Sequence, residues 1–290
     1  MSTSSPGARS FAVRTTARQR IICRGVRALA LAVFAFALVA PSGCQQEERE
    51  ATMDDDATAN AMVNMTVVFD NNPGPQGLRT GWGFGCVVEL PDTTVLFDTG
   101  ADGGVLLANM AVLDIDPSSV DLVVLSHIHG DHVGGLMGFL ERNADVRVCV
   151  PPAFPPQFKS AITATGAELV EAQPGQELAS HVYTTGQLGT GVKEQALVVD
   201  TQVGMVVITG CAHPGVVQMV AAAKQIRDVG VELVFGGFHL GGASRAQLEA
   251  ILDGFRDLGV YRVGPCHCSG DQARAFFADR YGQAYVPVAL

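Results

Sequence analysis

Basic residues are scarce in this 290-residue chain, and they are unevenly placed. The sequence has 19 Lys and Arg against 29 Asp and Glu. Six arginines fall in residues 1–43, which contain no acidic residue, so the rest of the chain carries 13 basic against 29 acidic residues. Because contacts with nucleic-acid phosphates require Lys and Arg, this deficit argues against a nucleic-acid partner.

The first 44 residues lack an apolar run long enough to cross a membrane. The run ALALAVFAFALVA at 28–40 is shorter than the roughly 20 residues that a transmembrane helix needs. An arginine-rich stretch precedes it and PSGC follows, an order typical of a secretory signal. Since Ser-Gly-Cys resembles the end of a bacterial lipobox, we predict a lipoprotein signal over residues 1–44, with lipid on Cys44. An ordinary cleaved signal and an uncleaved anchor are the alternatives.

Large apolar side chains are almost absent from residues 45–61, QQEEREATMDDDATANA. Such a segment cannot bury enough surface to order itself, so we expect a disordered acidic linker. Residues 62–290 then form one large domain. The mature protein is expected to be exported to the cell envelope, on the periplasmic side, and held to the membrane by its N-terminal lipid.

Cysteines are too few for a disulfide framework. Five lie beyond residue 44, an odd number without dense spacing: Cys86, Cys149, Cys211, Cys266 and Cys268. A zinc knuckle would need a second closely spaced pair, which the sequence lacks. We therefore interpret Cys266 and Cys268 as packing or redox-sensitive residues rather than ligands.

Apolar patterning predicts paired strands in the first half of residues 62–290 and alternating strands and helices in the second. Early strands are expected at 65–70, 84–90, 93–100, 121–125 and 145–150, and early helices at 104–113, 133–142 and 157–165. Later helices are expected at about 215–228, 244–258 and 271–279, with an edge strand at 285–290. This order indicates mixed sheets covered by helices, an α/β sandwich.

Histidine is as sparse as cysteine, yet three of the seven histidines occur in SHIHGDHVGG at 126–135. This segment directly follows an expected strand, and His213, His239 and His267 each follow a later one. Ligands collect beyond the carboxyl ends of strands in open α/β sheets. We therefore expect these side chains to converge at one edge, together with Asp98.

Spacing within SHIHGDHVGG indicates ligands for two metal ions. His127 and His129 point the same way on extended backbone, and Asp131 and His132 follow at the turn into a helix. Imidazole and carboxylate suit zinc, which we expect in one or two copies, with manganese or iron as alternatives. Two such ions can hold a hydroxide between them and polarise a phosphoryl or carbonyl oxygen.

His127-Ile-His129-Gly-Asp131-His132 resembles the H-x-H-x-D-H signature of the metallo-β-lactamase superfamily. The resemblance implies a four-layer αββα sandwich in which these four residues bind metal. His267 matches the late histidine that completes the second site.

Two further positions follow from that resemblance. Asp98, in Asp98-Thr99-Gly100, resembles an aspartate that orients ligand histidines from behind. The same tripeptide occurs in aspartic proteases, but those enzymes need a second one, which this chain lacks. Cys211 stands where a bridging aspartate is usual, and we assign it a supporting role. His213, two residues on, is expected to replace a ligand histidine that the chain lacks.

The segments EQALVV, GCAHPG, GGFHL and PCHCSG together resemble the family of the archaeal dihydropterin ribofuranosylaminobenzene-phosphate synthase. That enzyme joins a dihydropterin to a ribofuranosylaminobenzene phosphate, so a transferase is one hypothesis.

The principal hypothesis is an exported hydrolase, in which a metal-held hydroxide attacks a phosphoester or carboxyl derivative of a small-molecule substrate. Asp131 would then orient the water and His239 would steady the developing oxyanion. A non-catalytic metal-binding lipoprotein is the third hypothesis.

Overall fold

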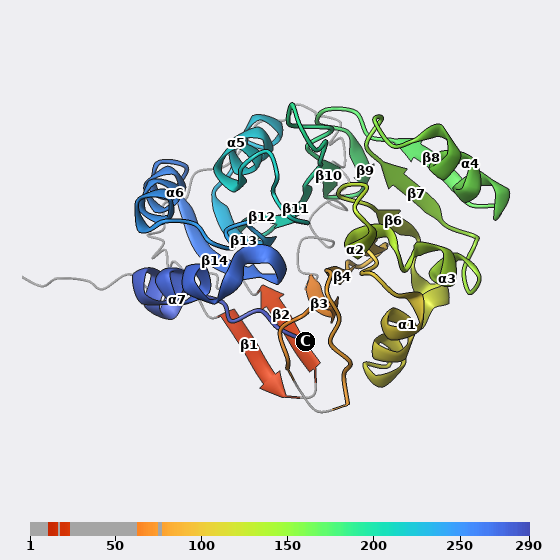
Figure 1. Ribbon diagram of the computed structural model, residues 1–290, viewed down its shortest axis with the longest axis horizontal. Helices are drawn as coiled ribbons and strands as arrows, with labels where there is room; N and C mark the ends of the chain where they lie inside the picture. Colours follow the sequence, from red (N-terminus) through yellow and green to blue (C-terminus); the bar gives the residue numbers. More distant parts are fainter. Residues whose placement is uncertain (1–10, 17, 24–62, 75–76) are drawn as a thin grey trace, which may run out of the picture.

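The structure is a computed structural model that describes residues 11–16, 18–23, 63–74 and 77–290 (Figure 1). Two β-sheets lie face to face, and helices cover the outer face of each sheet. This is the α/β sandwich that the sequence predicts.

The first sheet has eight strands in the order β1-β2-β3-β4-β5-β6-β7-β8. Neighbours run antiparallel as far as β5 and parallel from β5 to β8. The strands are β1 (Phe11–Thr16), β2 (Arg18–Cys23), β3 (Asn64–Phe69), β4 (Gly85–Glu89), β5 (Thr94–Phe97), β6 (Leu122–Val124), β7 (Arg147–Val150) and β8 (Glu168–Glu171).

The second sheet has six strands in the order β14-β13-β12-β11-β10-β9. Neighbours are antiparallel from β9 to β12, and β12, β13 and β14 are parallel. The strands are β9 (Glu177–Ala179), β10 (Val182–Thr184), β11 (Leu197–Thr201), β12 (Gly204–Thr209), β13 (Val231–Gly237) and β14 (Val260–Cys266).

Helices pack on the outer faces of both sheets. Those on the first sheet are α1 (Gly103–Val112), α2 (Gly130–Val133), α3 (Leu136–Leu140) and α4 (Pro156–Ala164). Those on the second sheet are α5 (Val216–Ile226), α6 (Arg245–Asp257) and α7 (Gly270–Tyr281). Three short 3₁₀ turns complete the described elements: η2 (Pro117–Ser119), η3 (His267–Ser269) and η4 (Gly282–Ala284).

Alternating side chains of β4 show how the layers are held together. Cys86 and Val88 point into the core between the sheets, where they join residues of the second sheet such as Leu233. Val87, between them, packs in the outer layer with Leu106 of α1. All of these side chains are fully buried, and burying a Val or Leu side chain contributes about 1.5–3 kcal/mol.

Two expected elements are wrong in detail. The helix expected at 133–142 is interrupted at Gly134 and Gly135, where the carbonyl oxygens of Ala101 and Thr99 approach so closely that only glycine fits. Two short helices, α2 and α3, therefore stand in its place. The edge strand expected at 285–290 forms only one bridge, from Tyr285 to β14.

The predicted signal and linker lie mostly outside the described residues, so the domain division at 44 and 61 stays a prediction. Strands β1 and β2 lie within the predicted signal, and β2 pairs with β3 at Ile21–Met65 and Ile22–Asn64. Cleavage before Cys44 would remove both strands from the mature sheet. Among the described residues, no helix is both long enough and apolar enough to cross a membrane.

Candidate metal centre

Five strand ends converge on one edge of the sandwich. Asp98 follows β5 and His127 follows β6 in the first sheet, and Cys211, His239 and His267 follow β12, β13 and β14 in the second. The crevice beyond the carboxyl ends of the strands is thus lined from both sheets, as the sequence predicts.

Four of these turns use backbone that side chains rarely adopt. Asp98, Ala212, His239 and His267 have φ angles of 55°, 58°, 52° and 46°. A non-glycine residue in this region costs on the order of 1–3 kcal/mol and persists only where its surroundings hold it. Such strain clusters at functional sites.

The first donor set consists of His127, His129 and His213. Their ring centroids lie 4.6–4.9 Å apart, and His127 Nε2 lies 3.1 Å from His129 Nδ1. One donor atom from each ring lies within 4.8 Å of the others. Three imidazoles at this spacing match the ligands of a zinc site with one open position.

The second donor set consists of Asp131, His132, Cys211 and His267. His132 Nε2 lies 3.6 Å from Asp131 Oδ2 and 3.3 Å from Cys211 Sγ. His267 Nε2 lies 3.3 Å from the same carboxylate oxygen. The rings of His127 and His132 are 4.2 Å apart, so the two sets adjoin.

Four of the histidines are held from behind through Nδ1, which leaves Nε2 facing the crevice. The four contacts are His127 with Ser126 Oγ (2.9 Å), His132 with Asp98 Oδ2 (2.7 Å), His213 with Glu194 Oε2 (2.9 Å) and His267 with Asn71 Oδ1 (2.9 Å). Polar partners of this kind fix the orientation of ligand imidazoles.

Asp98 lies behind His132, in contact with its Nδ1. Its carboxylate accepts the backbone N–H and the hydroxyl of Ser126, both at 2.7 Å, beside its contact with His132. Burial raises the pKa of Asp98 to about 7, and the bonds from Ser126 oppose that rise. A side chain on Gly210 would fill this space, at 2.9 Å from Asp98 Oδ2.

Glu194 is the main residue that sequence reasoning missed. Its fully buried carboxylate accepts the backbone N–H groups of Cys211, Ala212 and His213, each at 2.8 Å, in addition to the His213 ring. Burial acts to raise the pKa of Glu194, but these bonds outweigh it and lower the pKa to about 2. A lone acid in EQALVV, directly before a buried strand, was the signal available in the sequence. Asn71 gave none.

The electrostatics of the donors suit a cation. Burial and neighbouring imidazoles lower the pKa values of His127 and His132 to about 3, so both rings are neutral, the form that binds metal. Burial acts to raise the pKa of Asp131, but its close contact with His267 Nε2 and its attraction to His132 lower the pKa overall. His267 Nε2 is buried and makes no hydrogen bond of proper geometry within the described residues. The donors therefore fit divalent metal ions.

His239, His181 and Cys266 lie outside the two donor sets. His239 lies at the exposed rim, with its ring 4.5 Å from that of His213. His181 is exposed and belongs to none of the donor groups. Cys266 is buried in the core between the sheets. Cys211, expected behind the ligands, instead has its Sγ among the donor atoms.

An exposed aromatic side chain stands over the second donor set. Trp82 is 61% exposed, and its ring centroid lies 5.0 Å from that of His267. Its loop is fixed to the metal-ligand segment, because the N–H of Phe84 donates to the carbonyl of Asp131. A side chain on Gly83 would overlap that carbonyl, so only glycine permits the close approach.

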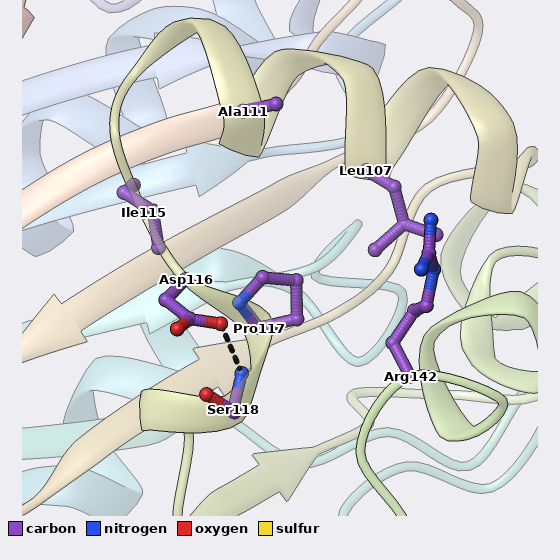
Figure 2. A pocket seen from close by; sticks show the side chains of 7 residues that line it. All are labelled: Leu107, Ala111, Ile115, Asp116, Pro117, Ser118 and Arg142. Atoms are coloured by element: carbon purple, nitrogen blue, oxygen red, sulfur yellow. Dashed lines mark hydrogen bonds between the residues drawn. The ribbon is translucent and has the colours of Figure 1, made fainter.

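A pocket of about 280 Å³ opens beside His213. The loop at 189–192, Pro214 and Gln218 form its other walls. A separate hollow, between α1 and η2, is lined by Leu107, Ala111, Ile115, Asp116, Pro117, Ser118 and Arg142 (Figure 2). It contains no histidine or cysteine, whereas the pocket at His213 adjoins the first donor set.

Comparison with known proteins agrees with this geometry. Residues 86–215, which include both His127–His132 and Cys211–His213, match the model of the metallo-beta-lactamase superfamily. Over these residues the chain is similar to that superfamily. Members typically bind divalent metal ions, and the two donor sets are candidates for that role here.

Individual relatives refine this placement. The chain is 28% identical over 236 residues to the 7,8-dihydropterin-6-methyl-4-(beta-D-ribofuranosyl)-aminobenzene-5'-phosphate synthase of Methanocaldococcus jannaschii, covering 66% of this chain and 80% of that protein. It is also 28% identical to Tm1679, a metal-dependent hydrolase of the beta-lactamase superfamily, with a TM-score of 0.61 over 77% of this chain and 94% of that one. YhfI from Bacillus subtilis, 17% identical with a TM-score of 0.58, shares the metallo-beta-lactamase fold over 79% of this chain and 97% of its own.

Proposed function

We propose that this protein is a metallo-beta-lactamase-type hydrolase that uses two divalent cations, zinc being the expected metal. The observation that carries the proposal is the meeting of two donor sets, His127/His129/His213 and Asp131/His132/Cys211/His267, at one edge of the sandwich. Similarity to the hydrolase Tm1679 supports it. When bound, two such ions supply a nucleophile at neutral pH and polarise a phosphoryl or carbonyl oxygen.

The chain's own residues would position the reactants. Asp131, only partly covered, presents its carboxylate to the crevice, where it would orient the attacking water. His239 at the rim would donate a hydrogen bond to the oxygen that gains charge in the transition state. Trp82 and the pocket beside His213 would hold the rest of a small-molecule substrate.

A substrate panel tests this proposal. Zinc-loaded protein is incubated with phosphomonoesters, phosphodiesters, lactones and β-lactams, beside the matched variants His132→Asn and His181→Asn. The proposal expects turnover of one class by the wild type and by His181→Asn, and its loss in His132→Asn. Full metal loading without turnover of any class would count against a hydrolase.

Transferase activity is the second candidate, because the chain is similar to the archaeal synthase over two thirds of its length. Reactions run in ¹⁸O-labelled water separate the two. A hydrolase places ¹⁸O in the product. A transferase, supplied with a ribofuranosylaminobenzene phosphate and a dihydropterin donor that carries a leaving group, forms a coupled product without the label and releases that group.

We also propose that the protein is exported and anchored by lipid at Cys44. The support is the order of arginine-rich, apolar and PSGC segments in residues 1–44. Cys44→Ser should release the protein from the membrane fraction. N-terminal sequencing of the mature protein then decides whether β1 and β2 remain: a chain that still begins at residue 1 and fractionates as soluble would contradict export.

A further inference from the structure

A third group of donor atoms adjoins the two sets already described. Cys211, His239 and Cys268 follow β12, β13 and β14, and one donor atom from each lies within 4.8 Å of the others. Two thiolates and an imidazole are ligands that zinc and softer cations prefer. With metal–sulfur bonds of about 2.3 Å and metal–nitrogen bonds of about 2.0 Å, donors on one tetrahedral ion lie roughly 3.5–3.8 Å apart. Donor atoms within 4.8 Å of one another are compatible with that spacing.

The backbone makes room for the two sulfurs to meet. A side chain on Gly237, the last residue of β13, would lie 2.7 Å from Cys268 Sγ and 3.2 Å from the Cα of Cys211. Only glycine at this position lets the two cysteines approach across β13. Both cysteines are free thiols in the structure.

His239 is held in place for the same group. Its backbone N–H points at Cys268 Sγ, at 3.3 Å, and its φ is 52°. This left-handed turn directs the exposed side chain of His239 toward the cysteines instead of along the strand. The strained conformation thus brings the third donor to the two sulfurs.

We propose that Cys211, His239 and Cys268 form a third cation site, which takes a thiophilic divalent cation such as Zn²⁺ or Cd²⁺. Cys211 Sγ belongs both to this group and to the set of Asp131, His132 and His267, so its sulfur is shared between neighbouring ions. Each thiol releases its proton on binding, and the fourth position is left to solvent or substrate. The site does not depend on which reaction the centre performs.

Cadmium binding tests the third site on the full-length, reduced protein. Metal content is measured by elemental analysis, and thiolate–cadmium charge-transfer absorbance reports sulfur ligands separately. The compared proteins are wild type, Cys268→Ala and His239→Asn, with Cys86→Ala and His181→Asn as matched controls. Asn is chosen because it tolerates the left-handed backbone of His239 and His181.

The proposal expects Cys268→Ala and His239→Asn each to bind one Cd²⁺ fewer than wild type, while both controls keep the full content. The charge-transfer absorbance should fall by about half in Cys268→Ala, because one of two sulfurs is lost. Should Cys268→Ala fail to fold, His239→Asn at the exposed rim still decides the matter.

Equal cadmium content and equal absorbance in wild type and Cys268→Ala would overturn the third site. A Cys211–Cys268 disulfide that persists in wild-type protein under reductant would overturn it as well. Failure of the principal centre has a different signature: His127→Asn should reduce cadmium content but leave the thiolate absorbance intact.

Discussion

Glu194 Oε2 lies 2.9 Å from His213 Nδ1, and the same buried carboxylate accepts the backbone N–H of His213. One acid therefore fixes both the ring and the turn that carries it. His127, His132 and His267 each have a polar partner of their own, so protein contacts fix the orientation of all four rings. Preorganisation of this kind is what a tight metal site requires.

Replacing that acid should weaken the centre without unfolding the domain. Glu194→Gln keeps the size but loses the charge and one acceptor, so we expect metal affinity to fall about 10–100-fold. Glu194→Ala should fall further, because three backbone N–H groups lose their partner. Competition with a chromophoric chelator measures the affinity, with Glu177→Gln, at an exposed acid of β9, as control. Equal affinity in Glu194→Gln and wild type would remove Glu194 from the site.

Trp82 should contribute to substrate binding more than to the chemical step. Its ring is exposed beside His267 and touches the mouth of the crevice. Trp82→Ala should raise KM several-fold and leave kcat within about twofold, because ground-state and transition-state binding are lost together. Tyr261→Ala is the matched control. Tyr261 is an exposed aromatic at the start of β14, about 20 Å along the strand from His267. A fall in kcat at unchanged KM would contradict this role.

Two glycines of SHIHGDHVGG should respond oppositely to alanine. A side chain on Gly135 would overlap the carbonyl oxygen of Thr99, so Gly135→Ala should lower the free energy of unfolding by about 1–3 kcal/mol. Gly130 has open space around its Cβ position and begins α2, so Gly130→Ala should leave stability unchanged or raise it by up to about 1 kcal/mol. Urea denaturation of metal-free protein measures both, and a similar loss in the two variants would refute the packing argument.

Tyr281 should set part of the alkaline limit of stability. Burial raises the pKa of its hydroxyl to about 12, and that oxygen has no hydrogen-bond partner among the described residues. The pKa of Tyr281 in the folded state lies above its unfolded value of about 10. The free energy of unfolding is therefore unaffected by this group below pH 10, and it falls as the pH rises from 10 through 12. Tyr281→Phe should be about 1 kcal/mol more stable than wild type at pH 7, and the gap should widen at pH 11. Thermal unfolding at both pH values tests this, with Tyr261→Phe as control; a gap that narrows at pH 11 would contradict it.

The sequence predicts the fold and most of the side chains that meet at the crevice, because both depend on local patterns. The histidines of SHIHGDHVGG follow a buried strand, and strand-end geometry then places His213 and His267 nearby. Glu194 and Asn71 were missed because their roles depend on contacts across 19 and 196 residues, which no local pattern records. Cys211 was placed behind the ligands because spacing alone does not show which way a side chain turns.

Metal content tests the central claim most directly. Wild type and His181→Asn, purified and loaded with zinc, should each hold at least about two ions per chain by elemental analysis. His132→Asn and His127→Asn should each lose about one ion or more, since each variant removes a donor from one set. Unchanged zinc in His127→Asn and His132→Asn would show that the convergent histidines are not the metal centre.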